Sequence, residues 1–202
     1  MATANLVDFQ NIFSLEGKVA VITGSSRGLG LAAASGILQV GASKVYITSR
    51  SASGCEEACA ILNALPNKRA DAQAIPVPAD SSTVDGIQEL VDAVSKSTDH
   101  VDILLINAGM AYGERFEKHD EKKWTEVMDI NLKSVFYAAQ SSADTGSVAI
   151  DSKAYASSDS WLICLSGAPF TGIHCDLNGV LSPQKGPIPV AVTSGPGIGP
   201  FH

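Results

Sequence analysis

The chain has 202 residues and a formal net charge of −7, with 45% hydrophobic and 17% charged residues. This length fits one domain better than two, and the composition is typical of a soluble globular protein. The acidic balance argues against a nucleic-acid partner, because such proteins usually carry a basic surface. No apolar run reaches the roughly 18 residues needed to cross a membrane. The first residues show no basic segment followed by an apolar stretch, so we expect a cytoplasmic protein without a membrane partner.

Residues 1–142 alternate between strand-like and helix-like patterns, separated by short breaks. We expect strands at 18–23, 44–48, 74–77 and 101–106, and helices at 28–40, 51–65, 82–97 and 121–140. The strands are almost continuously hydrophobic, which indicates a parallel sheet covered on both faces. Regular alternation of strand and helix predicts an α/β fold with a doubly wound parallel sheet, in the strand order 3-2-1-4.

Residues 143–202 differ in composition from the preceding part. They contain no Glu and no Arg, but six of the nine prolines and eight of the eighteen glycines. Such a composition favours an irregular segment. One apolar run, Trp161–Leu165, is a candidate fifth strand. We therefore divide the chain into a folded part, 1–142, and an irregular C-terminal part, 143–202.

The four cysteines follow no disulfide or zinc spacing. We interpret them as small buried hydrophobic residues. A metal site built from Cys164, His174, Cys175 and Asp176 is the alternative, and its spacing does not favour it. The sequence therefore predicts no metal.

A glycine-rich segment, Thr23-Gly24-Ser25-Ser26-Arg27-Gly28-Leu29-Gly30, follows the first strand and opens the first helix. In this context Gly24 would permit a tight turn, Gly28 a close approach of backbone to a pyrophosphate, and Gly30 close packing of the helix on the sheet. The free N–H groups at the helix N-terminus would bind the phosphates. A glycine turn without a ligand is the alternative, but the position between strand and helix favours a Rossmann-type dinucleotide site.

The second strand indicates which dinucleotide binds. NAD sites place an acidic residue about 20 positions after the glycines, where it holds the ribose hydroxyls. Here the second strand ends in Thr48-Ser49-Arg50, and Arg27 lies within the glycine segment. Two guanidinium groups can bind a 2′-phosphate, so we predict NADP(H), with two solvated loop arginines as the alternative.

Over residues 12–140 the sequence resembles the short-chain dehydrogenase/reductase family. The family's TGxxxGxG motif matches Thr23 to Gly30, which includes Ser26 and Leu29, and its fourth-strand motif matches Asn107-Ala108-Gly109. The resemblance implies that Asp80 contacts the adenine, and that Asn131 holds a water molecule in a proton relay. Within the family the sequence resembles fungal 3-oxoacyl-[acyl carrier protein] reductases, which implies a small carbonyl or alcohol substrate. The resemblance also implies a homo-oligomer for intact family members.

The family's catalytic pair is missing. In the family a tyrosine protonates the carbonyl oxygen, and a lysine four positions later lowers the tyrosine pKa. Tyr137 is followed at that spacing by Ser141, and Tyr155 by Asp159. Ser166, in Leu165-Ser166-Gly167, resembles the family's catalytic serine, with an ordinary loop serine as the alternative. Asn131 and Ser166 are thus the remaining catalytic candidates.

Three hypotheses account for this departure. The chain is an NAD(P)-dependent oxidoreductase that reduces a ketone or oxidises a secondary alcohol, or an inactive NADP-binding protein, or a chain whose C-terminal part is aberrant or truncated. One observation bears on the hypothesis of an aberrant C-terminal part. When Val180 and Leu181 are back-translated with suitable codons and read one base later, the resulting amino-acid sequence begins a Tyr-x-x-x-Lys motif. A reading-frame shift beyond about residue 167 would account for that motif, with a genuine alternative tail and an unrelated fusion as the alternatives.

Overall fold

The fold is built around one parallel sheet. A computed structural model describes residues 13–144 and 161–164 of the chain. Five strands pair in the order β3-β2-β1-β4-β5, and every pairing is parallel. The strands are β1 (Val19–Thr23), β2 (Lys44–Thr48), β3 (Gln73–Pro76), β4 (Ile103–Ile106) and β5 (Trp161–Cys164).

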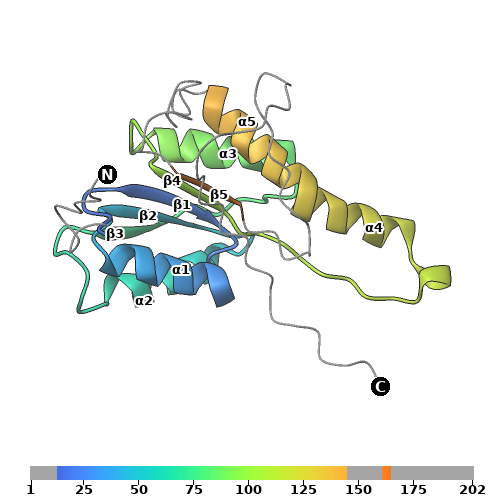
Figure 1. The fold of residues 1–202 in the computed structure, drawn as a ribbon, viewed down its shortest axis with the longest axis horizontal. Coiled ribbons are helices and arrows are strands. Elements are labelled where there is room, and N and C mark those ends of the chain that lie inside the picture. The colour runs from blue at the N-terminus through green and yellow to red at the C-terminus, as the bar shows by residue number, and fades with distance from the viewer. Residues whose placement is uncertain (1–12, 145–160, 165–202) are drawn as a thin grey trace, which may run out of the picture.

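Helices cover both faces of the sheet. They are α1 (Gly28–Gln39), α2 (Ala52–Asn63), α3 (Val84–Ser95), the short 3-10 turn η1 (Phe116–Lys118), α4 (Glu121–Met128), the π-helical turn η2 (Asp129–Lys133) and α5 (Ser134–Asp144). Figure 1 shows α1 and α2 on one side of the sheet, and α3 and α5 on the other. In the same view α4 extends beyond the sheet. The arrangement is a doubly wound α/β fold.

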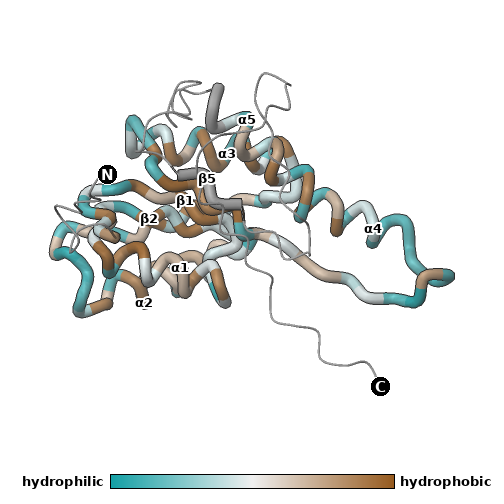
Figure 2. The backbone as a smooth tube through the Cα atoms, in the orientation of Figure 1, coloured by the Kyte–Doolittle hydropathy of each residue, from teal (hydrophilic) through white to brown (hydrophobic). Residues whose placement is uncertain are grey.

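Alternate strand residues build two cores, one on each face. Ala20 and Ile22 of β1 pack with α1 and α2, whereas Val19 and Val21 pack with α3 and with Ala138 of α5. Neighbouring residues of a strand point to opposite faces, so a sheet buried on both sides needs uninterrupted apolar strands. Figure 2 shows this hydrophobic colouring along β1 and the strands beside it.

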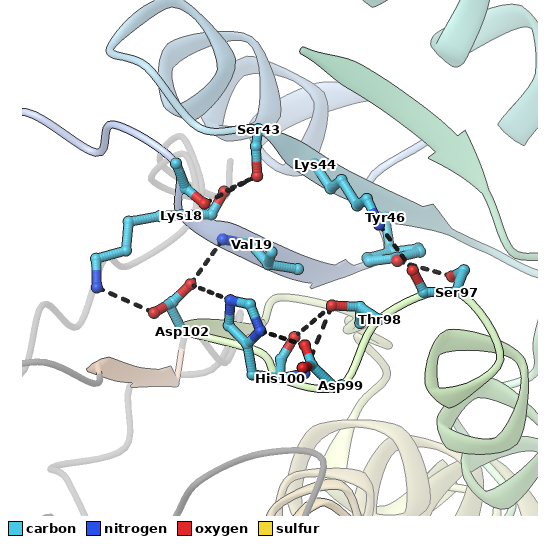
Figure 3. A network of polar contacts seen from close by, with 11 residues as sticks. Lys18, Val19, Ser43, Lys44, Tyr46, Ser97, Thr98, Asp99, His100 and Asp102 are labelled. Carbon is cyan, nitrogen blue, oxygen red and sulfur yellow. Dashed lines mark hydrogen bonds and ion pairs between the residues drawn. The ribbon is translucent and has the colours of Figure 1, made fainter. Parts of the chain in front are cut away.

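Polar side chains in and around the amino ends of the strands join neighbouring segments, as Figure 3 shows. Lys18 Nζ donates a hydrogen bond of 3.0 Å to Asp102 Oδ1, and the backbone N–H of Val19 donates one of 2.8 Å to Asp102 Oδ2. The hydroxyls of Tyr46 and Ser97 lie 2.7 Å apart. The opposite, carboxyl edge is where open α/β sheets bind their ligands.

The expected strand order 3-2-1-4 is confirmed, and the candidate fifth strand pairs with β4. One element differs: the expected continuous helix 121–140 is divided by the π-helical turn η2. Residues 145–160 and 165–202, on which most of the predicted irregular segment falls, lie outside the described residues. Within the described part of the chain, no helix is long and apolar enough to span a bilayer.

Candidate functional site

The turn after β1 requires glycine at two positions. Gly24 and Gly28 have φ angles of 65° and 59°, in the left-handed region that other residues rarely adopt. A Cβ at Gly24 would also lie 2.8 Å from Ala108 Cα. A Cβ at Gly28 would meet no atom within 4 Å. The outer side of the turn at Gly28 is therefore open, as the approach of a pyrophosphate requires.

Gly30 is where α1 packs closely against the end of the sheet. A Cβ at this position would lie 2.5 Å from the carbonyl oxygen of Gly24 and 2.6 Å from Asn107 Nδ2. Real Cβ atoms do not approach other atoms this closely. The role predicted from sequence for Gly30, close packing of helix on sheet, is the one that the structure shows.

Hydrogen bonds join the glycine turn to the Asn107-Ala108-Gly109 segment after β4. Thr23 Oγ1 accepts from the backbone N–H groups of Asn107 and Ala108, both at 2.9 Å. The side-chain Nδ2 of Asn107 donates to the carbonyl oxygens of Thr23 at 3.0 Å and Gly24 at 3.1 Å. Two motifs 84 residues apart in the chain thus form one rigid unit.

A second connection, between β1 and β2, was not predicted from the sequence. Ser25 is fully buried; its Oγ donates to the carbonyl of Ile22 at 2.6 Å and accepts from the N–H of Thr48 at 3.0 Å. The N–H of Ser25 donates to the carbonyl of Thr48 at 3.0 Å. A serine within a glycine-rich turn looks like an ordinary turn residue, so only its burial reveals this role.

The charged groups of the site lie outside this buried frame. Arg27 and Leu29 are exposed on the glycine turn, beside half-buried Ser26, and Arg50 is exposed just after β2. Near Ser26 the N-terminus of α2 approaches, since a Cβ at Gly54 would lie 3.6 Å from Ser26 Cβ. The backbone segments that carry Arg27 and Arg50 are neighbours, joined by the hydrogen bond from Ser25 N–H to the Thr48 carbonyl.

Asp80 follows β3 and lies near Arg50. Its Oδ1 accepts hydrogen bonds from the N–H and Oγ of Ser82 at 2.9 and 2.7 Å. Partial burial acts to raise the pKa of Asp80, but the hydrogen bonds from Ser82 and the charge of Arg50 outweigh it and lower the pKa below its ordinary value. The carboxylate is ionised at neutral pH beside a guanidinium.

Asn131 lies in η2 and its side chain holds the segment after Gly109. Its Oδ1 accepts from the backbone N–H of Met110 at 3.1 Å, and its Nδ2 donates to the carbonyl of Met110 at 2.6 Å. The other catalytic candidate, Ser166, lies outside the described residues. The role of both in chemistry stays a prediction.

These features define a class of protein. A tight glycine turn, an open helix N-terminus and polar groups at the carboxyl edge, where strand order reverses between β1 and β4, make an α/β nucleotide-binding fold. Among the described residues, no group of three or more His, Cys, Asp or Glu side chains could hold a metal. Cys55 and Cys59 are buried free thiols, as predicted. The side chain of Cys164 and residues His174, Cys175 and Asp176 lie outside the described part of the chain.

Comparison with known proteins gives the family. Residues 18–148 match the model of the short chain dehydrogenase family, and the chain belongs to that family. It is 39% identical over 128 residues to a rhamnolipids biosynthesis 3-oxoacyl-[acyl-carrier-protein] reductase from Pseudomonas aeruginosa, covering 63% of this chain and 47% of the relative. It is 37% identical over 131 residues to a 2-dehydro-3-deoxy-D-gluconate 5-dehydrogenase from Escherichia coli, covering 65% of this chain and 49% of the relative.

Solved structures show the same fold. The Pseudomonas aeruginosa RhlG/NADP active-site complex superposes with a TM-score of 0.66 at 30% identity, covering 83% of this chain and 62% of that one. L-sorbose reductase from Gluconobacter frateurii, complexed with NADPH and L-sorbose, gives 0.64 at 27% identity, covering 76% and 53%. The chain spans about half the length of the curated relatives it matches. These relatives are bacterial, so the resemblance to fungal members stays a prediction.

Proposed function

We propose that this chain binds NADP(H) at the carboxyl edge of its sheet. The observation that carries the proposal is the glycine turn, open at Gly28 and flanked by two exposed arginines, Arg27 and Arg50. The N-terminus of α1 would bind the pyrophosphate, because its N–H groups and dipole favour negative charge. Arg27 and Arg50 would bind the 2′-phosphate that distinguishes NADP from NAD.

The surroundings of Arg50 fit a phosphate of this kind. β2 ends at Thr48 and is followed by Ser49 and Arg50, without the acid that would repel a 2′-phosphate. Asp80 is acidic, but its carboxylate is already hydrogen-bonded by Ser82 and lies near the Arg50 charge. We assign Asp80 to the adenine side of the site, as the family resemblance implies. The segment Asn107-Ala108-Gly109 would line the nicotinamide side.

Titration calorimetry of the 202-residue chain with NADPH and NADH tests the proposal. Arg50→Ala should weaken NADPH binding about ten- to a hundredfold, since a hydrogen bond to a charged group contributes roughly 1.5–3 kcal/mol. NADH binding should change little. Arg27→Ala should act in the same direction.

Arg69→Ala is the matched control, because it removes the same charge at the amino edge of the sheet, where Arg69 pairs with Asp71 and Glu16. It should leave the preference for NADPH unchanged. Equal affinities of the wild-type chain for the two cofactors, or an Arg50→Ala variant that retains the full NADPH preference, would contradict the proposal.

Turnover is a separate matter from binding. When bound, NADPH would supply a hydride to a carbonyl carbon, and the chain would have to supply a proton to the oxygen. No tyrosine in this sequence has a lysine four positions later. We therefore infer that the chain binds cofactor without turnover, and an assay with NADPH and 3-oxoacyl or sugar-type ketones should show no oxidation above background.

The alternative is an active oxidoreductase acting on a ketone or a secondary alcohol. It is favoured by the relatives, which are named as a 3-oxoacyl-[acyl-carrier-protein] reductase and a 2-dehydro-3-deoxy-D-gluconate 5-dehydrogenase. Cofactor-dependent turnover that is lost in Ser166→Ala or Asn131→Ala would establish this alternative. Homo-oligomer formation and a cytoplasmic location stay predictions under either function.

A further inference from the structure

The hydroxyl of Ser25 makes one donated and one accepted hydrogen bond inside the protein. The Ser25 side chain is fully buried, its hydroxyl donates to the Ile22 carbonyl, and the same oxygen accepts from Thr48 N–H. Buried polar groups persist where they are fully paired, because an unpaired one costs about 1–3 kcal/mol. The hydroxyl therefore fixes the end of β2 against the beginning of the glycine turn.

The hydrogen-bonded residues Ser25 and Thr48 lie close in sequence to the two arginines. Arg27 follows Ser25 by two residues, and Arg50 follows Thr48 by two residues. Beyond β2 the connection continues toward Asp80, since Thr48 Oγ1 donates to the Val77 carbonyl and Ala79 N–H donates to the Ser49 carbonyl at 3.1 Å. The backbone from which each guanidinium extends is thus held by buried bonds.

We propose that Ser25 is a positioning residue that sets the preference of this chain for NADP(H) over NAD(H). The inference rests on the proposed function, that Arg27 and Arg50 bind the 2′-phosphate. Ser25 touches no cofactor in this scheme, because it is buried beneath the turn. It acts through the relative placement of the two arginine-bearing segments.

The physical reason is the geometry of two guanidiniums on one phosphate. Hydrogen bonds to charged groups are short and weaken steeply when distance or angle departs from the optimum. Arg27 and Arg50 are exposed and lie outside regular strands, so their spacing depends on where their backbone is anchored. NADH has no 2′-phosphate, so its binding should not depend on the spacing of the two arginines.

The test compares the ratio of NADPH to NADH association constants in variants of the full chain. Ser25→Ala removes the hydroxyl and should lower this ratio about three- to tenfold, with most of the loss in NADPH affinity. If Ser25 had a purely structural role, its loss would reduce the folded fraction and weaken the binding of NADPH and of NADH equally. In an Arg50→Ala background the effect of Ser25→Ala on the ratio should shrink, because the two residues act on the same contact.

Tyr46→Phe is the matched control, since it also removes a buried hydroxyl hydrogen bond from β2, toward Ser97 at the α3 end. It should leave the ratio unchanged. If Ser25→Ala does not fold, the same ratio is measured in Ser25→Cys. This variant retains a weak donor and acceptor, so its ratio of NADPH to NADH association constants should fall less.

An unchanged ratio in the Ser25 variant that folds, or an equal fall in Tyr46→Phe, would overturn the inference. A wild-type chain that binds neither cofactor, or both equally, would instead remove the proposed function and this inference with it. The two failures are therefore distinguishable from the wild-type titration alone.

Discussion

Thr23, Ser25 and Thr48 are polar side chains buried at the ends of apolar strands. Burying a hydroxyl without a partner is costly, and each of these three is hydrogen-bonded to backbone of a neighbouring segment. Their bonds run from β4 through β1 and β2 to the residue after β3. At this edge, buried hydroxyls make the frame and exposed arginines provide the charge.

The thiol of Cys59 on α2 leads to a pH prediction. Burial, and next the neighbouring Cys55, raise the pKa of Cys59 from 9.0 to about 11. The folded state therefore holds this proton more tightly than the unfolded chain. The protonated thiol of Cys59 therefore adds to the free energy of unfolding. This contribution is fully present below about pH 9 and is lost as the pH rises through 11.

Urea unfolding of wild type and Cys59→Ala at pH 8 and pH 10 measures this effect. Between the two pH values, the free energy of unfolding of the wild type should fall by about 1 kcal/mol more than that of the variant. One pKa unit corresponds to about 1.4 kcal/mol. Alkaline groups that do not interact with Cys59 affect both proteins equally and cancel in the difference. Parallel losses in the two proteins would show that Cys59 does not titrate between its folded and unfolded values.

At the scale of elements, the α4–η2–α5 rod is the main departure from expectation. Its sequence has a helical pattern throughout, yet the middle is a π-helical turn that contains Asn131. Such turns occur as single insertions within α-helices, often at functional sites. Here the side chain of Asn131 reaches across to both backbone groups of Met110, 21 residues earlier.

Asn131→Ala should free the segment after Gly109. Loss of two hydrogen bonds to a partly buried backbone should cost about 1–3 kcal/mol of unfolding free energy. The amide of Met110 should also exchange its hydrogen faster. Asn131→Asp keeps the acceptor for Met110 N–H but loses the donor, so it should protect that amide more than Asn131→Ala does. Unchanged exchange at Met110 in Asn131→Ala would contradict this assignment.

At the scale of the whole molecule, the rod exposes large apolar side chains. Phe136 is 53% exposed, Trp124 57%, and Phe116, in η1 before the rod, 94%. Figure 1 shows that α4 lies beyond the edge of the sheet. Exposed apolar surface promotes association, at some 25 cal/mol for each Å² removed from water.

We therefore expect the isolated chain to self-associate or to unfold easily. Light scattering after size exclusion, with a thermal melt, measures both properties. Phe136→Lys should reduce association, whereas Ile61→Lys, at a position 58% exposed on α2, should have less effect. A monomer with a sharp transition above about 55 °C would contradict the expectation, since ordinary mesophile domains melt at roughly 45–65 °C.

Much of the fold could be predicted from the sequence because its signals are local. Apolar runs such as Ile103–Ile106 predict buried strands, and the spacing of three and four residues in Val84–Ser95 predicts a helix with one apolar face. Gly24 and Gly30 were recognisable because the residues around them form a strand–turn–helix pattern. The division at 142 stays a prediction, and so do the hypotheses for the residues that follow it.

The sequence by itself determined the order of elements, the glycine turn after β1, the two arginines and the absence of a Tyr-x-x-x-Lys pair among these 202 residues. Only the tertiary structure decided that Ser25 is a buried connection to Thr48, 23 residues away, and that Asn131 holds Met110 from a π-helical turn. The reason is physical. Short-range patterns encode backbone conformation and the buried face of each element, whereas the partner of a hydroxyl or an amide depends on which distant segments packing brings beside it.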